Sequence, residues 1–336
     1  NMYTSRIKGI GHYVPENVVT NKDLEAFMET SDEWIQERTG IKERRWIDPK
    51  TDDMPSTMGT KAARIAIENA GLTPDDIDFI VFATLSPDYY FPGPGVQVQD
   101  QLGIREIGAL DVRNQCSGFI YSLSVADQFI KTGMYKNVLV IGSEYHSGGL
   151  EKSTRGRGVT VIFGDGAGAV VLSRSEDEKK GILSTHLHSE GKHAKELALI
   201  GPATNRWVDR IMTENDPEDT SYYPYMNGNF VFKHAVTRFS EVIHEALMTN
   251  GYKPEDINML IPHQANLRIS QFIQKQMKLG DDQVYNNIMR YGNTTAASIP
   301  IALSEAHLEG KIKEGDLVCM AAFGSGFTWA SALIKW

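Results

Sequence analysis

A cysteine, a histidine and an asparagine occupy positions in this chain where their side chains could do chemistry. Cys116 follows the apolar run 107–112 and precedes a helical pattern over residues 117–131. The first backbone N–H groups of a helix are unpaired and carry partial positive charge, so a thiolate is favoured at such a position. The alternative is a small buried cysteine with no chemical role, which is the usual state of an intracellular cysteine.

His263 follows the apolar run 257–261 and Pro262, and a helical pattern begins at Asn266. Open α/β sheets bind ligands at the carboxyl ends of their strands, which makes His263 a site candidate; the alternative is a structural histidine. Asn293 follows Gly292 and, taken alone, is best interpreted as a turn residue. Its position within an internal repeat changes that interpretation.

Two sequence echoes indicate that the second half of the chain repeats the first. Residues 70–80 are echoed by residues 250–260, and the glycine-rich residues 163–171 by residues 323–331. Asn293 falls between the two echoes in the second half, as Cys116 does in the first. We therefore expect two similar α/β halves, residues 1–175 and 176–336, with two matching helix starts facing each other at their junction.

The elements that must position these residues alternate between strand and helix, which predicts an α/β fold. Strands are expected at residues 7–13, 77–84, 107–112, 138–143, 167–172, 182–187, 257–261, 317–322 and 329–335. Helices are expected at residues 21–27, with Asn21 as the cap, and at 56–70, 94–102, 117–131, 232–248, 266–277 and 295–308. A polar and aromatic loop is expected from Gly201 to about Asn229.

Composition narrows the class of protein. A chain of 336 residues with 41 % hydrophobic and 23 % charged residues is typical of a soluble globular protein. A net charge of −9 argues against a general nucleic-acid binder. Neither Cys116 nor Cys319 has a Cys or His at metal-ligand spacing, so no metal is expected. Without a signal-peptide pattern or an apolar run that could span a bilayer, a cytoplasmic protein with no membrane role is expected.

A Cys, a His and an Asn in this chain order have known uses. In papain-like proteases the Asn orients the His, but the cysteine there lies near the mature N-terminus in a different motif. A thiol hydrolase with a Gly-x-Cys-x-Gly elbow is disfavoured, because Asn114 occupies the first glycine position.

Along nearly its whole length the chain resembles β-ketoacyl-acyl carrier protein synthase III, a condensing enzyme of the thiolase superfamily. The matching segments are residues 30–35, 38–45, 111–119, 163–168, 262–268, 292–298 and 323–329. They include Asp-Val-Arg-Asn-Gln-Cys, which ends at Cys116, and Pro-His-Gln-Ala-Asn-Leu-Arg, which contains His263. The resemblance implies a thiolase-like fold in which two duplicated α/β halves form α-β-α-β-α layers.

The resemblance also implies a reaction. An acyl group would pass from acyl-CoA to Cys116 and then condense with malonyl-acyl carrier protein as carbon dioxide is lost. A neutral His263 and the Asn293 amide would donate hydrogen bonds to the thioester oxygen on which charge develops, and the backbone N–H groups of Cys116 and Ser325 would form the oxyanion hole. Coenzyme A is then part of a substrate, and no cofactor is expected.

Further sites follow from the same resemblance. Coenzyme A would be held by Trp34, Arg38, Arg157, Gly228 and Asn266. The acidic carrier protein would dock on Lys233, Arg268, Lys275 and Lys278. The protein would be a homodimer in which Phe91, on a loop that crosses the interface, closes the partner's acyl pocket.

Two alternatives remain at this point. Carrier-independent enzymes similar to type III polyketide synthases use the same three residues with malonyl-CoA. A purely binding role, as in chain-length factors that have lost the nucleophile, is disfavoured by the presence of Cys116. The chain also departs from the family pattern: residues 113–115 are not small, Ser325 replaces a glycine, and the loop 201–225 looks long. We therefore expect an acyl donor longer than acetyl, or a specialised pathway.

Overall fold

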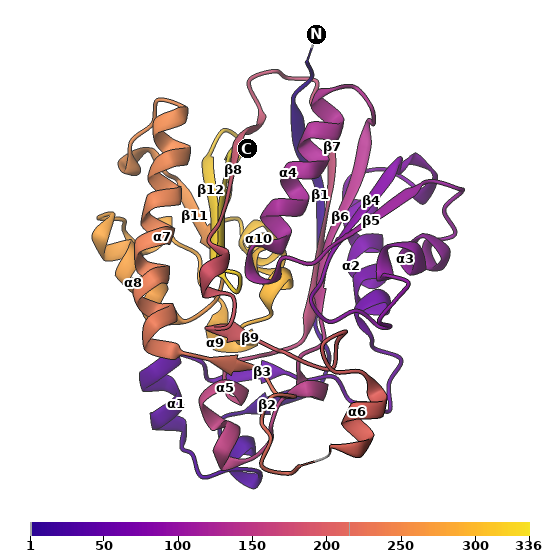
Figure 1. The fold of residues 1–336 in the computed structure, drawn as a ribbon. Coiled ribbons are helices and arrows are strands. Elements are labelled where there is room, and N and C mark those ends of the chain that lie inside the picture. Colours follow the sequence, from indigo (N-terminus) through magenta and orange to yellow (C-terminus); the bar gives the residue numbers. More distant parts are fainter. Residues whose placement is uncertain (1, 215) are drawn as a thin grey trace.

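Two β-sheets form the frame of the protein, and the order of the four strands in the second matches that of four of the five strands in the first (Figure 1). The computed structural model describes residues 2–214 and 216–336; Asn1, and Asn215 within the expected loop, lie outside the described residues. The first sheet has the order β1 (Ser5–Tyr13), β7 (Gly166–Arg174), β6 (Asn137–Glu144), β4 (Phe79–Ala83), β5 (Gly108–Val112). The second has the order β8 (Gly181–Ser189), β13 (Thr328–Lys335), β12 (Leu317–Gly324), β11 (Met259–Pro262).

Strand directions match between the sheets as well. In the first, β1 and β6 are both antiparallel to β7, and β4 is parallel to β6. In the second, β8 and β12 are both antiparallel to β13, and β11 is parallel to β12. The duplication expected from the sequence echoes is therefore confirmed in the topology.

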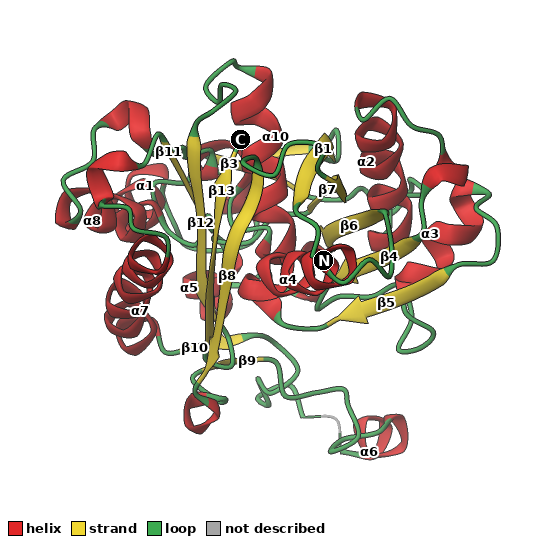
Figure 2. Ribbon diagram, turned by 90° about the horizontal axis from the view of Figure 1, so that it is seen from above, coloured by secondary structure: helices red, strands yellow, loops and turns green. Residues whose placement is uncertain are grey.

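Helices complete an α-β-α-β-α arrangement of layers (Figure 2). The middle layer consists of α4 (Gly118–Lys131) and α10 (Ser298–Leu308). The outer face of the first sheet is covered by α2 (Pro55–Asn69) and α3 (Pro94–Leu102). The outer face of the second is covered by α7 (Gly228–Thr249), against which α8 (Leu267–Gln276) packs. The predicted fold class is confirmed.

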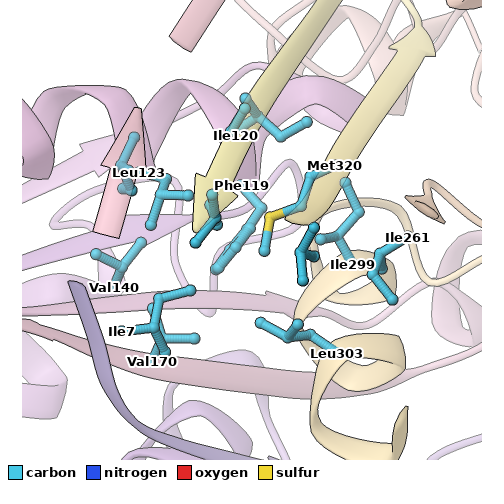
Figure 3. Packing of buried hydrophobic residues seen from close by; sticks show 14 of the residues in the cluster. Ile7, Phe119, Ile120, Leu123, Val140, Val170, Ile261, Ile299, Leu303 and Met320 are labelled. Carbon is cyan, nitrogen blue, oxygen red and sulfur yellow. The ribbon is translucent and has the colours of Figure 1, made fainter. Parts of the chain in front are cut away.

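The core between the sheets fixes the two middle helices (Figure 3). Leu123 of α4 and Leu303 of α10 are fully buried in one apolar cluster with Val140 and Val170 of the first sheet and Met320 of the second. Truncating one such leucine to alanine typically costs about 2–5 kcal/mol of stability. The start of each middle helix is therefore held rigidly at the junction of the halves.

A smaller group of short elements lies at one end of the sheets, at the bottom of Figure 1. It contains β2 (Val18–Thr20), α1 (Asp32–Thr39), β3 (Glu43–Arg45), α5 (Arg157–Thr160) and α9 (Ile288–Tyr291). The helix expected at residues 21–27 is wrong, because only a 3₁₀ turn, Asp23–Ala26, forms there. Asn21 does not cap it; its buried amide donates to the Ile41 carbonyl oxygen and accepts from the guanidinium of the buried Arg44.

The stretch expected to be a loop from Gly201 is only partly irregular. It contains α6 (Val208–Thr213) and β10 (Tyr225–Met226), which pairs with β9 (Leu197–Ala198), and α7 begins at Gly228 rather than at residue 232. These elements are too short for a hydrophobic period to appear in the sequence. Among the described residues, no helix is both long and apolar enough to cross a membrane.

Candidate active site

Two tight turns meet at the junction of the halves, one before each middle helix. Cys116 lies in the 3₁₀ turn Gln115–Ser117, and the turn Thr295–Ala297 takes the same place before α10. Gln115 and Thr295 have positive φ angles of 47° and 54°, an uncommon conformation for residues other than glycine. The expected pair of facing helix starts is therefore present. The structural counterpart of Cys116 is Ala296, however, and Asn293 lies three residues earlier in the approach to the turn.

The sulfur of Cys116 sits against the β12–β13 turn. A Cβ on Gly324 would lie 2.5 Å from Sγ, so only glycine allows this approach. The backbone N–H groups of Ser325 and of Cys116 itself lie close enough to the sulfur to lower the pKa of the thiol. The two groups implied as an oxyanion hole therefore lie beside the nucleophile candidate.

Burial has a larger effect on this thiol than its N–H donors. Cys116 is 7 % exposed, and desolvation raises the pKa of its thiol to about 12. The N–H groups of Ser325 and Cys116 lower that pKa, whereas the charge of Glu144 raises it. Burial therefore opposes the thiolate that the helix start favours, and the thiolate in the free protein stays a prediction.

Glu144 is a second titratable group of the site, which the sequence reasoning missed. It is fully buried at the end of β6, where its Oε1 accepts from Thr84 Oγ1 at 2.6 Å, Leu85 N at 2.9 Å and Ser86 Oγ at 3.0 Å. Burial raises the pKa of this carboxyl to about 7. The available signal was a glutamate directly after an apolar strand.

The Glu144→Gln variant should make Cys116 more reactive toward iodoacetamide at pH 8. At that pH the wild-type carboxylate is mostly ionised, and removing its charge lowers the pKa of the thiol. A fall of one pKa unit would speed alkylation by up to about tenfold. Mass spectrometry of the alkylated cysteine over time measures the rate. Glu68→Gln, at an exposed position of α2, is the control, and an unchanged or slower rate for Glu144→Gln would contradict the coupling.

His263 lies directly beyond β11 and is held by α10. Its Nδ1 is 2.5 Å from Ser298 Oγ, which also accepts the Gln264 N–H at 3.2 Å. Ser298 can then donate its own proton to Nδ1, which leaves the ring proton on Nε2. Nε2 is buried and has no hydrogen-bond partner within residues 2–214 and 216–336. Burial lowers the pKa of His263 to about 3, so the imidazole is neutral.

Asn293 is positioned by its backbone and by its own side chain. Its main-chain N–H donates to Ile162 O at 2.8 Å, and its carbonyl oxygen accepts the Gly164 N–H at 3.0 Å. Its Oδ1 accepts the Thr295 N–H at 2.8 Å. Since the oxygen of the amide is occupied, the amide presents its NH₂ group as the donor.

His146 also belongs to the site, although the sequence reasoning did not single it out. Its Nε2 is 2.7 Å from Thr295 Oγ1, and its ring centroid is 4.8 Å from that of Phe163. Burial lowers the pKa of His146 to about 3, and its positive charge, if present, would lower the pKa of His263. Neutral His146 therefore supports the turn Thr295–Ala297, in which the N–H of Thr295 donates to the Asn293 side chain. Its position just after β6 was the only sequence signal.

The expected coenzyme A residues gather mainly around α1. The Trp34 ring has the guanidinium of Arg38 at 4.2 Å and that of Arg157 at 4.8 Å. Asn266 caps α8 through the Arg268 N–H and donates to the Arg38 carbonyl oxygen at 3.1 Å. Gly228 is the first residue of α7, and a Cβ there would meet nothing within 4 Å.

The residues expected to bind the carrier protein differ in exposure and in their contacts. Lys233, Lys275 and Lys278 are exposed. Arg268, in contrast, donates to the carbonyl oxygens of Glu37 at 3.0 Å and Gln36 at 2.8 Å, at the C-terminal end of α1. It therefore joins α8 to α1, a structural role that sequence reasoning missed.

Phe91 stands in an exposed aromatic loop. It is 79 % exposed, and the neighbouring Tyr89 and Tyr90 are 58 % and 54 % exposed. The Tyr90 ring lies 5.4 Å from that of Trp207, which is itself 47 % exposed. These four side chains form an exposed aromatic patch.

The two halves share one topology and meet at a cysteine at the start of a central helix. These features place the protein in the class of thiolase-like condensing enzymes. The models for 3-oxoacyl-acyl-carrier-protein (ACP) synthase III and for its C-terminal part match residues 110–191 and 247–336. Beta-ketoacyl-acyl-carrier-protein synthase III from Caldanaerobacter subterraneus subsp. tengcongensis is 46 % identical, over 98 % of this chain and 97 % of that one.

Solved structures agree with these matches. The 3-oxoacyl-acyl-carrier-protein synthase III from Aquifex aeolicus VF5 is 44 % identical with a TM-score of 0.90, over 99 % of this chain and 100 % of that one. The priming beta-ketosynthase from the R1128 polyketide biosynthetic pathway is 31 % identical with a TM-score of 0.90, over 100 % and 97 %. The chain therefore belongs to the β-ketoacyl-acyl-carrier-protein synthase III family, and it is a condensing acyltransferase. The resemblance read from the motifs is confirmed.

Proposed function

We propose that the protein moves an acyl group from acyl-CoA onto Cys116 and condenses it with malonyl-acyl carrier protein to give a 3-oxoacyl-acyl carrier protein. One observation supports this most: the two donor sets are separate. The backbone N–H groups of Cys116 and Ser325 lie beside the sulfur, whereas Nε2 of His263, just beyond β11, has no hydrogen-bond partner in the described part of the chain. Two successive steps that develop charge at different oxygens need such an arrangement.

In the first step the Cys116 sulfur attacks the thioester carbonyl carbon of acyl-CoA. The N–H groups of Cys116 and Ser325 stabilise the oxyanion of the tetrahedral intermediate. The Cys116 thiol gives its proton to water as the new S–C bond forms. The C–S bond to coenzyme A then breaks, and the departing thiolate takes up a proton from water.

In the second step malonyl-acyl carrier protein loses carbon dioxide, and negative charge develops on its thioester oxygen. Nε2–H of His263 and the amide NH₂ of Asn293 donate to that oxygen. Both groups are neutral, so neither protonates the carbanion readily. The carbanion attacks the acyl carbon on Cys116, the C–S bond breaks, and the released thiolate takes a proton from water.

The substrate-binding residues form part of the proposal. Trp34, Arg38 and Arg157 hold the adenine of coenzyme A by stacking, with Gly228 and Asn266 along the pantetheine arm. In the free protein the guanidinium groups lie against the Trp34 ring, at 4.2 and 4.8 Å, so a guanidinium must move away from the ring for the adenine to stack there. Neither the catalytic residues nor the residues assigned to coenzyme A require a cofactor. The exposed Lys233, Lys275 and Lys278 receive the acidic carrier protein.

We also propose a homodimer, divided in each copy into halves 1–175 and 176–336. The exposed patch of Tyr89, Tyr90, Phe91 and Trp207 supports it, since a second copy would cover these apolar rings. Phe91 would then close the acyl pocket of the partner. A cytoplasmic location accords with substrates of this kind.

Labelling of Cys116 tests the proposal. The purified protein is incubated with a mixture of coenzyme A thioesters of increasing chain length, and the acyl group on Cys116 is identified by mass spectrometry. The departures from the family pattern at residues 113–115 and in the loop 201–225 lead us to expect a donor longer than acetyl. Labelling by acetyl-CoA alone would refute the longer-chain expectation, and no labelling by any thioester would refute the acyl transfer.

The acceptor is tested on the acylated protein. Malonyl-acyl carrier protein should give the 3-oxoacyl product at a much higher rate than malonyl-CoA at equal concentration. The reverse preference would establish the alternative, a carrier-independent condensation of the type III polyketide synthase kind. The R1128 relative is named as a priming ketosynthase of a polyketide pathway, which favours testing donors other than acetyl.

A further inference from the structure

Two histidines and a glutamate converge at the end of β8 and the start of α7, apart from the catalytic groups. The donor atoms of Glu190, His193 and His234 all lie within 4.8 Å of one another. His193 Nε2 is 2.8 Å from Glu190 Oε1, and the rings of His193 and His234 are 4.9 Å apart. All three side chains are half-buried, so an ion from solvent can reach them.

Hydrogen bonds around the cluster orient two of its three side chains, His234 and Glu190, for binding a metal ion. His234 Nδ1 is 2.9 Å from the Phe230 carbonyl oxygen, which can only accept. The ring proton of neutral His234 is therefore on Nδ1, and Nε2 presents a lone pair. Glu190 Oε2 is held by Arg238 at 3.1 Å, which leaves Oε1 toward the imidazoles. Metal-binding histidines and carboxylates are commonly oriented in this way by outer hydrogen bonds.

Arg238 does not leave the cluster with an uncompensated positive charge. Its Nη1 also donates to Glu241 Oε2 at 2.8 Å, and its guanidinium lies 4.3 Å from the Trp329 ring centroid. A cation between the two imidazoles is therefore attracted by the negative charge of Glu190. The positive charge of Arg238 is balanced by the negative charge of Glu241.

We propose that Glu190, His193 and His234 bind a zinc-class divalent ion. Two imidazoles and one carboxylate form a donor set that zinc uses, and imidazole selects against magnesium and calcium. Zinc bonds of about 2.0–2.2 Å place tetrahedral ligand atoms roughly 3.3 Å apart, so the three groups need to move by about an ångström. The ion replaces the proton between His193 Nε2 and Glu190, and that imidazole then carries its proton on Nδ1.

The ion would brace the turn that holds Ser325. Glu190 and Phe327 exchange two backbone hydrogen bonds, of 2.8 and 3.0 Å, and Phe327 follows the Gly324–Ser325 approach to Cys116. A metal bond between Glu190 and α7 therefore ties this hairpin to the outer helix. The expectation of no metal considered only the cysteines, and His193 and His234 come together only in the fold.

Metal content tests the proposal independently of the condensing activity. Untagged protein carrying Cys116→Ser, which removes a competing thiol, is incubated with zinc, freed of excess by gel filtration and measured by mass spectrometry for metals. We expect about one zinc per chain, and loss of most of it in the added His234→Gln and His193→Gln variants. His244→Gln, at an exposed position of the same helix, should keep the zinc.

The outcomes separate the possible sites. The proposal would be overturned if the parent protein held less than about a tenth of an equivalent of zinc per chain. It would also be overturned if the His234→Gln variant held as much zinc as the parent. Loss in His188→Gln instead would overturn it too and place the ion at His186, His188 and Glu245, where Glu245 bridges both rings. Zinc should also raise the melting temperature of the parent and not of His234→Gln, and Co²⁺ should give a visible spectrum only with the intact set.

Discussion

Cys116→Ala is expected to abolish acyl transfer from coenzyme A while malonyl-acyl carrier protein is still decarboxylated. Without the sulfur no acyl-enzyme forms, and loss of a nucleophile commonly costs a factor of about 10⁴–10⁶ in rate. Decarboxylation survives because His263 and Asn293 lie on separate elements and keep their own hydrogen bonds, to Ser298 and Thr295. Acyl-enzyme formation is followed by mass spectrometry, and decarboxylation by release of labelled carbon dioxide.

Cys319→Ala provides a matched control for this variant. Cys319 is fully buried, and burial raises the pKa of its thiol to about 12 as it does for Cys116, yet Cys319 lies within β12. The control should form the acyl-enzyme and condense at nearly the wild-type rate. Condensation retained in Cys116→Ala, or lost in Cys319→Ala with the fold intact, would mean that the nucleophile is misassigned.

The strands and long helices could be predicted because their sequence pattern reports burial directly. The apolar run 138–143 became β6, and the helical pattern 117–131 became α4 with its preceding turn. Asn21 misled the prediction of a helix because its cap-like position concealed a tertiary role, as a partner of the buried Arg44. Short elements such as α5 and α6 carry too few residues for any period to be visible.

The sequence predicted those site residues whose reactive side chains stand at a recognisable position, such as the end of a strand. Cys116 and His263 each follow a strand, and the internal repeat gave Asn293 its weight. Glu144 and His146 escaped, because their partners, Thr84 and Thr295, come from distant segments. The burial that opposes ionisation of Cys116 could not be foreseen either, since it comes from packing that no local sequence encodes.

His263→Ala and Asn293→Ala should reverse the pattern expected for the cysteine variant. Acyl transfer to Cys116 should largely survive, because the N–H donors of Cys116 and Ser325 are on the backbone. Decarboxylation should fall by about 10²–10³ in each variant, the usual loss when one donor to a developing oxyanion is removed. The same two assays measure both steps, with His307→Ala, exposed near the end of α10, as the control.

The neutral state of His263 sharpens this expectation. Its pKa is lowered to about 3 by burial, so raising the pH from 5 to 9 should not change its charge, and the decarboxylation rate should show no titration of this histidine. A base that must first lose a proton would instead give a rise through pH 6–7. If acylation and decarboxylation fell equally in His263→Ala, the imidazole would serve both steps, and the separation of the two donor sets would be wrong.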